Sequence, residues 1–471
     1  KTLIAGAGDA GELILRNIQN TQNPYQVVGF VDDSQVRQGV SIHGVEVLGK
    51  IADIPQIVPQ KKIEVLIVAM PSADSRTIQE AVRRAREVGL RKIKIIPPID
   101  DVFSGKVTIG QLREVQMEDL LVRDVVLTNR EPIEEFIKNK VVLVTGAAGS
   151  IGSELCRQIA SFAPSSLILL DQDETGIFNI SNELKDKLGV KDITTTSVVD
   201  IQDKEGIDHI FTEFKPDIVF HAAAYKHVPL MEEHPGAAVK NNVFGTQNVA
   251  KAALEQGVEK FVFISTDKAV NPTSVMGATK RVGEMICQAF NGKGKTKFIS
   301  VRFGNVLDSR GSVIPIFREK IKKREPIQVT HPEMERYFMV TSEACLLVLQ
   351  AGAMGKGGEV FVLDMGNPIK ILELAKEMIR LSGLTPDRDI PIVFTEPRPG
   401  EKLSEEILSA KEGTIATQNQ KIFMAKLSSV EENLLNQGLE NLKKAVYNGE
   451  RDEIIKALKV LVPNYNALFT H

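Results

Sequence analysis

Asp267 and Lys268 place an acid and an amine next to each other, directly after Thr266 and the apolar run Lys260–Ile264. The apolar run predicts a strand, so the three polar residues would stand at its carboxyl end. A carboxyl group and an amine in contact can carry out opposite proton transfers, because one donates while the other accepts. The alternative is a surface ion pair that caps a loop. The triplet therefore predicts acid–base chemistry if a cofactor binds beside this strand end.

A glycine-rich turn, with Gly146, Gly149 and Gly152, follows the strand-like run Val141–Thr145 and opens a helical pattern. At such a turn the backbone amides of the helix N-terminus bind a pyrophosphate. Asp171 closes the next apolar run, where a carboxylate holds the ribose hydroxyls of an adenosine and repels a 2′-phosphate. This order of elements predicts a dinucleotide site that prefers NAD to NADP. The alternative is a tight turn without a ligand.

The composition is that of a globular protein of two or three domains: 471 residues, of which 43% are hydrophobic and 25% charged. The net charge of −3 and the lack of basic runs beside aromatics argue against a nucleic-acid partner. Cys156, Cys287 and Cys345 lie in apolar patterns without metal-ligand spacing, so we expect reduced core residues and no metal. No apolar run reaches the about 18 residues that span a bilayer. Since the chain starts at Lys1 with a strand, we expect further sequence upstream.

The first stretch repeats the glycine theme, with Gly6, Gly8 and Gly11 between a strand and a helical pattern. The alternation of strands and helices that follows predicts a small parallel-sheet domain. Asp32 or Asp33, at the end of its second strand, can hold a ribose if the domain binds a nucleotide. The alternative is a scaffold or regulatory domain, in which the glycines only allow close helix–strand packing.

The predicted fold class is α/β, with two Rossmann-like parallel-sheet domains. The first covers residues 1–112, and residues 113–139, which are charged and lack a sustained period, form a linker. The second covers residues 140–471 and is doubly wound, with ligands at the carboxyl ends of its strands. After about residue 302 polar segments interrupt the pattern, which predicts a C-terminal substrate-binding subdomain.

The chain from Lys140 to about Lys402 resembles the extended short-chain dehydrogenase/reductase family. The resemblance rests on the glycine turn, Asp171, Ala222–Ala224, Asn242 with Gly245 and Thr246, and Lys280. It implies bound NAD, with Lys280 holding the nicotinamide ribose and supplying positive charge. The expected cofactor-binding residues are Gly146, Gly149, Ser150, Ile151, Gly152, Asp171, Asp200, Ala222, Ala223, Ala224 and Lys280.

Met276 departs from that family, since most members have a tyrosine four residues before the lysine, as the base for hydride transfer. A thioether neither takes up nor donates a proton. Either the enzyme is inactive, or another group supplies the base, or the alignment is displaced. None of the five tyrosines precedes a lysine by four residues, which argues against displacement. Tyr225 is a further candidate, entering from another loop.

The triplet Thr266-Asp267-Lys268 resembles the nucleotide-sugar 4,6-dehydratases, in which Thr-Asp precedes a proton acceptor. Met276, Lys268 and the first domain together resemble the long, membrane-attached polysaccharide-biosynthesis branch of these enzymes, which acts on UDP-N-acetylglucosamine. This resemblance implies a hydro-lyase (a lyase) that makes a UDP-4-keto-6-deoxy sugar, with retention at carbon 5. The product would serve polysaccharide biosynthesis or protein glycosylation.

The implied scheme gives a role to each residue of the triplet. NAD takes a hydride from carbon 4, and NADH returns it to carbon 6. Lys268, with a pKa lowered by desolvation and by Lys280, removes the carbon-5 proton while protonated Asp267 donates to the departing 6-hydroxyl. With Met276 in the tyrosine position, Thr266 is the candidate relay for the 4-hydroxyl proton.

The diphosphate and the uracil of such a substrate need cations and amides. Arginine suits a diphosphate through its planar guanidinium, although each such residue taken alone is more often a solvated surface charge. The residues expected to bind the substrate are Lys226, Asn305, Arg310, Arg336, Arg398 and Lys402.

Two other functions stay open. A nucleotide-sugar 4-epimerase shares the fold, NAD and carbon-4 oxidation, but it needs no proton pair such as Asp267 and Lys268. A non-catalytic NAD-binding regulatory protein would suit Met276, whereas the retention of Lys280 argues against it. We expect a homo-oligomer on the cytoplasmic side of the inner membrane, attached only through upstream segments, of which this chain is the soluble cytoplasmic portion.

Overall fold

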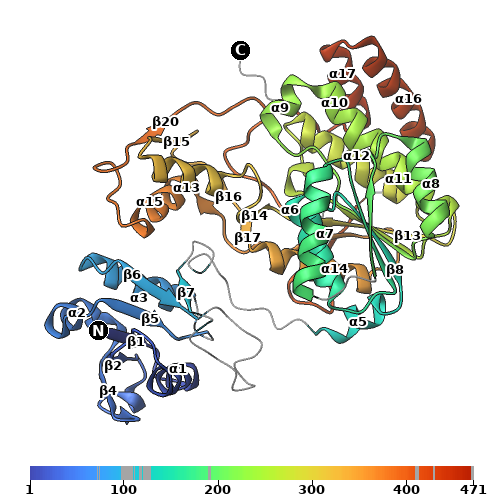
Figure 1. The fold of residues 1–471 in the computed structure, drawn as a ribbon. Coiled ribbons are helices and arrows are strands. Elements are labelled where there is room, and N and C mark those ends of the chain that lie inside the picture. The colour runs from blue at the N-terminus through green and yellow to red at the C-terminus, as the bar shows by residue number, and fades with distance from the viewer. Residues whose placement is uncertain are drawn as a thin grey trace. The chain divides into compact units, whose positions relative to one another are not determined.

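The computed structural model describes the chain except for residues 72, 74, 97–109, 111, 116–118, 120–128, 189–192, 409–412, 428–429 and 468–471. The chain divides into two compact units (Figure 1). The first consists of Lys1–Val126, Phe317–Ile327 and Leu374–Ile392, and the second of Leu127–Ile316, Gln328–Glu373 and Val393–His471. Nothing in the sequence pattern had placed the two later segments with the first unit. The predicted boundaries at residues 112 and 140 stay a prediction.

The first unit is a sheet with helices on both faces. Its elements are β1 (Thr2–Ala5), α1 (Asp9–Asn20), β2 (Val27–Val31), β3 (Ser41–Ile42), β4 (Val45–Gly49), α2 (Ile54–Lys61), β5 (Val65–Val68), α3 (Ser75–Glu87), β6 (Lys92–Ile95) and β7 (Arg113–Glu114), with 3-10 turns at Gln35–Arg37 and Ile51–Asp53. The strand order is β3-β4-β2-β1-β5-β6-β7, with β3 and β7 antiparallel to their neighbours. Apolar residues of α1 cover one face, and those of α2 and α3 cover the other.

The second unit is built on a nine-stranded sheet with the order β10-β9-β8-β11-β12-β13-β18-β22-β21. Its strands are β8 (Val141–Thr145), β9 (Ser166–Asp171), β10 (Thr194–Val198), β11 (Ile218–His221), β12 (Lys260–Ile264), β13 (Lys297–Arg302), β18 (Val360–Leu363), β21 (Thr414–Ala416) and β22 (Ile422–Ala425). The strands from β10 to β18 are parallel, and the last two are antiparallel. The predicted α/β class, with two Rossmann-like parallel sheets, is confirmed.

Helices cover both faces of this sheet (Figure 1). One face carries α5 (Glu131–Ile137), α6 (Ser150–Ala160), α7 (Glu174–Leu188) and α14 (Thr341–Met354). The other carries α8 (Lys204–Phe214), α9 (Val228–Glu233), α10 (Pro235–Val239), the π-helical turn η6 (Lys240–Gly245), α11 (Thr246–Glu255), α12 (Val275–Phe290), α16 (Glu432–Asn448) and α17 (Arg451–Leu461). The three cysteines are free and buried, as predicted.

Short elements follow β13, where the sequence pattern loses its regularity. They are β14 (Asn305–Val306), α13 (Val313–Lys323), β15 (Ile327–Val329), β16 (Glu335–Arg336), β17 (Phe338–Met339), β19 (Ile369–Lys370), α15 (Ile371–Leu381) and β20 (Ile392–Phe394). β14 pairs with β17, and β16 pairs with β19. Among the described residues, no helix combines the length and the apolar character needed to cross a bilayer.

The predicted linker contains a helix that the periodicity analysis missed. α5 begins beside Pro132 and buries Ile133 and Ile137 completely in the core of the second unit. A helix of seven residues completes only one i, i+3, i+4 set of apolar positions, here Ile133, Phe136 and Ile137, which is too short a pattern to stand out from its charged neighbours.

Candidate active site

The turn between β8 and α6 requires glycine at two positions because the backbone is crowded there. Gly146 has a φ of +71°, and a Cβ on it would lie 2.6 Å from the backbone nitrogen of Ala223. A Cβ on Gly152 would lie 2.0 Å from the carbonyl oxygen of Gly146. A Cβ on Gly149 would meet only that same oxygen, at 3.2 Å. Protein packing constrains Gly149 much less, so the close approach of a ligand phosphate is the physical reason for a glycine at this position.

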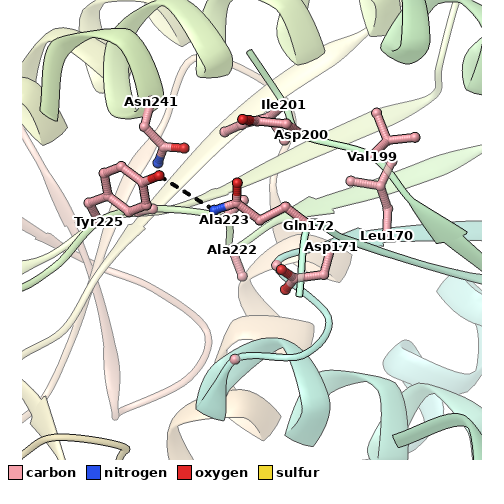
Figure 2. A pocket seen from close by; sticks show the side chains of 13 residues that line it. Leu170, Asp171, Gln172, Val199, Asp200, Ile201, Ala222, Ala223, Tyr225 and Asn241 are labelled. Atoms are coloured by element: carbon pink, nitrogen blue, oxygen red, sulfur yellow. Dashed lines mark hydrogen bonds between the residues drawn. The ribbon is translucent and has the colours of Figure 1, made fainter. Parts of the chain in front are cut away.

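A pocket opens where the strand order reverses, between β8 and β11 (Figure 2). Doubly wound sheets bind nucleotides in the crevice at such a reversal. The pocket is lined by Gly146, Gly149, Leu170, Asp171, Gln172, Val199, Asp200, Ile201, Ala222, Ala223, Ala224, Tyr225 and Asn241. Most of the predicted cofactor residues are thus brought together, while Ser150, Ile151 and Gly152 form the first turn of α6.

Two carboxylates at strand ends shape this pocket. Asp171 accepts a hydrogen bond of 3.0 Å from the backbone nitrogen of Ala148 in the glycine turn, and another of 3.0 Å from the nitrogen of Asp173. Asp200 accepts one of 2.9 Å from the nitrogen of Gln202. These bonds fix the carboxylates and leave lone pairs that can accept hydrogen bonds from sugar hydroxyls.

Tyr225 lies in the wall of the pocket, and its hydroxyl accepts a hydrogen bond of 3.5 Å from Gln172 (Figure 2). Asn242, in the π-helical turn, fixes the backbone here by accepting from the Tyr225 nitrogen at 2.8 Å and donating to the Thr279 hydroxyl at 3.1 Å. π-helical turns are frequent at functional sites. Since Gln172 follows Asp171, the Tyr225 hydroxyl points toward the expected adenosine end. This placement argues against Tyr225 as the missing base.

Thr266, Asp267 and Lys268 stand at the carboxyl end of β12, where the turn η7 (Asp267–Ala269) begins. One oxygen, Oδ1 of Asp267, accepts from the Thr266 hydroxyl at 2.8 Å and from Lys268 Nζ at 3.0 Å. Lys268 Nζ also donates to Oδ1 of Asn305 at 3.0 Å. Asp267 is 1% exposed. The hydroxyl, the acid and the amine therefore form one continuous hydrogen-bonded chain.

The charge state of Lys268 corrects one expectation. We predicted that desolvation and Lys280 lower its pKa. Burial does lower the pKa of Lys268, but the carboxylates of Asp267 and Glu405 outweigh it, so the pKa lies above its ordinary value despite the opposing charge of Arg336. In the free protein Lys268 is therefore an ammonium that pairs with Asp267.

Glu405 is a residue of this site that the sequence analysis missed. Its Oε1 lies 3.8 Å from Lys268 Nζ and 4.0 Å from Nε of Arg336. Arg336 is itself almost buried and donates to the carbonyl oxygens of Glu335 and Leu403. The sequence analysis predicted Arg398 and Lys402 as substrate residues in the polar segment that ends just before Glu405. The position of Glu405 beside Lys268 depends on contacts across more than a hundred residues.

Lys280 lies on α12, as predicted, and is 5% exposed. Desolvation lowers its pKa to about 7, although Glu284 opposes this shift. Its Nζ lies 4.0 Å from the centroid of the Phe263 ring. Burial alone would raise the pKa of Glu284, but its 2.7 Å ion pair with Arg302 and a hydrogen bond from Ser265 hold that pKa at about 2. Lys280 is thus an amine that changes charge near neutral pH.

Met276 lies on the same helix and is 4% exposed. It belongs to the core cluster that also contains Val275, Phe263 and Val243. The residue in the tyrosine position therefore has a packing role in this structure.

Cationic side chains gather around the loop after β11. Lys226 has its pKa lowered by burial and by Arg310, and the pKa of His227 is lowered by burial, Lys226 and Arg398. The backbone nitrogen of Arg310 donates to the Ser150 hydroxyl at 3.1 Å, beside the glycine turn. The nearby positive charges of Lys226 and Arg398 favour the neutral form of His227, as that of Arg310 favours the neutral form of Lys226. Such a cluster of cations is suited to an anion. His227 had not been predicted.

Several predicted substrate residues already have partners within the protein, and Arg310 itself lies 3.4 Å from Asp173. The Arg398 guanidinium pairs with Glu401 at 2.5 Å, and Lys402 Nζ donates to the carbonyl oxygen of Val270 at 3.0 Å. Lys402 thereby ties its segment to the loop that follows Lys268. Among the described residues, no group of three or more His, Cys, Asp or Glu side chains is arranged so that it could bind a metal ion.

The first unit repeats the turn geometry. Gly6 has a φ of +101°, and a Cβ on Gly11 would lie 2.0 Å from its carbonyl oxygen. Asp32 accepts from the backbone nitrogen of Ala7 at 2.8 Å, as Asp171 does from its turn. Arg37 lies 3.4 Å from Asp32 and beside Gly8.

Comparison with known proteins relates the chain to polysaccharide biosynthesis proteins. A family described as "Polysaccharide biosynthesis protein" matches residues 142–427, and one described as "CoA-binding domain" matches residues 1–97. The probable polysaccharide biosynthesis protein EpsC of Bacillus subtilis is 48% identical over 413 residues, which are 88% of this chain and 69% of that protein. The inverting UDP-N-acetylglucosamine 4,6-dehydratase of Campylobacter jejuni is 33% identical over 276 residues, 58% of this chain and 78% of that protein.

A solved structure shares the fold of part of the chain. The X-ray structure of Pen from Bacillus thuringiensis is 34% identical, with a TM-score of 0.57 over 63% of this chain and 92% of that chain. The chain is thus related to nucleotide-sugar dehydratases and epimerases and to capsular polysaccharide biosynthesis proteins.

Proposed function

Because the chain belongs to the polysaccharide biosynthesis protein family, we propose that it is an NAD-dependent 4,6-dehydratase that acts on UDP-N-acetylglucosamine. The reaction releases water and yields a UDP-4-keto-6-deoxy sugar for polysaccharide or glycan biosynthesis. The observation that carries the proposal is the hydrogen-bonded pair Asp267–Lys268, which stands one strand away from the dinucleotide pocket.

The residues that line the pocket have the chemical groups needed to bind NAD. The glycine turn exposes backbone to a pyrophosphate, Asp171 accepts from ribose hydroxyls and disfavours a 2′-phosphate, and Lys280 is proposed to hold the nicotinamide ribose. NAD held by these residues would supply the redox chemistry, as hydride acceptor from carbon 4 of the sugar and hydride donor to carbon 6.

The proton transfers follow from the hydrogen bonds of the triplet. Lys268 has to be a neutral amine to accept the carbon-5 proton, and its own proton can pass to Asp267 Oδ1, 3.0 Å away. That one step creates both the base and the carboxylic acid that protonates the departing 6-hydroxyl. The hydroxyl then leaves as water, and Lys268 returns a proton to carbon 5 when the hydride arrives at carbon 6.

The proton of the 4-hydroxyl needs a separate acceptor, since Met276 cannot take it. Lys280, with a pKa of about 7, is partly neutral at physiological pH and can accept this proton. Thr266 is the candidate relay, because its hydroxyl already donates to Asp267.

A nucleoside diphosphate is the expected anchor of the substrate. Lys226, His227 and Arg310 gather beside the glycine turn and the pocket, and Arg310 can bind two phosphate oxygens at once. Asn305, by contrast, contacts Lys268 and is proposed to orient that amine toward the sugar. Retention at carbon 5 stays a prediction, and the Campylobacter relative is named as the inverting enzyme.

Incubation with UDP-N-acetylglucosamine tests the proposal. The dehydratase converts it to a product lighter by one water in the mass spectrum. A product of unchanged mass but altered sugar configuration would identify a 4-epimerase instead. No conversion by a chain that carries NAD would favour a regulatory protein.

A further inference from the structure

Glu405 has the features of a working residue rather than of a surface charge. It is 6% exposed, although it lies in a loop that contains no helix or strand. A buried carboxylate is costly unless it is paired and hydrogen-bonded. The two cations near it, Lys268 and Arg336, lie at 3.8 and 4.0 Å, beyond ordinary hydrogen-bond length.

An unsatisfied oxygen sets Glu405 apart further. Its Oε2 is buried and has no hydrogen-bond partner among the described residues, and the same holds for Oδ2 of Asp267. These are the two carboxylate oxygens with this property in the described part of the chain, and the carboxyl groups that carry them both contact Lys268 through their other oxygen, Oδ1 at 3.0 Å and Oε1 at 3.8 Å. Buried unsatisfied groups are rare in proteins, and a cluster of two around one amine points to a function.

We propose that Glu405 is a positioning residue for proton removal: its carboxylate holds the Lys268 amine between Asp267 and Asn305 and stabilises the ammonium that forms there. The inference rests on the proposed function. In that step the C5–H bond breaks and an N–H bond forms on Lys268. The electron pair of the C5–H bond becomes the C5–C6 double bond, and the C6–O bond breaks as Asp267 protonates the leaving oxygen.

A purely structural partnership between Glu405 and Arg336 accounts for the geometry less well. Arg336 Nη1 already donates to the carbonyl oxygens of Glu335 and Leu403, at 2.7 and 3.2 Å. Glu405 is slightly closer to Lys268, and its charge raises the pKa of that amine. Removing this charge makes Lys268 a weaker base, so removal of the carbon-5 proton slows while carbon-4 oxidation is spared.

The test compares Glu405→Gln with Glu406→Gln in the full NAD-loaded chain. Glu406 is the next residue and is exposed, where it accepts a hydrogen bond from Asn271, so its variant is a matched control. We expect Glu405→Gln to lower kcat by about 10–100-fold with little change in KM. Bound NADH should accumulate, and the isotope effect of carbon-5 deuterated substrate should rise. Glu406→Gln should behave like the parent.

Glu405→Asp keeps the negative charge but places it one methylene further from Lys268. This second variant keeps the proposal testable if Glu405→Gln fails to fold. Glu405→Asp should have a kcat between those of Glu405→Gln and the parent. If Glu405→Asp folds and Glu405→Gln does not, a kcat of Glu405→Asp equal to the parent's overturns the inference. Equal kcat in Glu405→Gln and the parent, or a loss confined to KM with no NADH accumulation, overturns it as well. If the parent releases no water from UDP-N-acetylglucosamine, the proposed function fails first and the inference falls with it.

Discussion

Lys268 Nζ lies 3.0 Å from Asp267 Oδ1, so the two groups proposed to exchange protons with the sugar already exchange a hydrogen bond with each other. Lys268→Met removes the base and Asp267→Asn removes the acid, while both leave the cofactor pocket intact. Each should lower turnover by about 10²–10⁴-fold. Because carbon-4 oxidation precedes these steps, both variants should accumulate bound NADH, measured by its absorbance after substrate is added. Turnover of Lys268→Met near the parent rate would refute the assignment.

The glycine turn predicts opposite outcomes for two similar substitutions. Gly149→Ala meets only one oxygen at 3.2 Å, so the protein should fold and lose NAD affinity. Gly152→Ala places a methyl group 2.0 Å from the Gly146 oxygen, so it should destabilise the fold itself. Thermal unfolding together with the NAD content of the purified variants separates the two. Gly149→Ala with parental NAD content would show that this position does not face the pyrophosphate.

Met276 should matter for stability and little for chemistry. Met276→Ala leaves a cavity in a well-packed core and should cost about 2–5 kcal/mol of unfolding free energy. Turnover per folded, NAD-loaded molecule should stay substantial, since no proton carrier is lost. Thermal unfolding measures the expected loss of stability, and the mass of the product measures the expected retention of turnover. A loss of turnover as severe as that of Asp267→Asn, without loss of folding, would contradict this role.

The low pKa of Lys280 predicts how activity depends on pH. The amine accepts the 4-hydroxyl proton only when neutral, so kcat should fall about tenfold per pH unit below its pKa of about 7. The pKa of Lys280 is lower in the folded protein than in the unfolded chain. At any pH between these two pKa values, the unfolded chain therefore carries a proton on Lys280 that the folded protein lacks. The free energy of unfolding should therefore decrease as the pH falls from the unfolded pKa of Lys280 to about 7. A kcat that does not change between about pH 6 and pH 8 would exclude Lys280 as the acceptor.

Local patterns were sufficient to predict the turn and the strand ends. Gly146 and Asp171 belong to one continuous strand-turn-helix-strand unit, and Thr266, Asp267 and Lys268 follow a strand whose bounds agree with the structure. Their proximity follows from the order of parallel strands, because carboxyl ends lie along one edge. The extended short-chain dehydrogenase/reductase resemblance rests on these same units.

Residues whose role depends on distant contacts could not be found in this way. Glu405 reaches Lys268 from 137 positions along the chain, within a loop that has no period. The raised pKa of Lys268 depends on the adjacent Asp267 and in part on the same distant residue, Glu405. α5 was missed because seven residues give too short a pattern.

Turnover in D₂O tests the central claim, dehydration through the Asp267–Lys268 pair, in one measurement. The product of UDP-N-acetylglucosamine should be lighter by one water and should carry deuterium at carbon 5, because Lys268 exchanges with solvent before it returns a proton there. Mass spectrometry with fragmentation locates the label. A product that keeps the mass of the substrate and carries no deuterium would contradict the account.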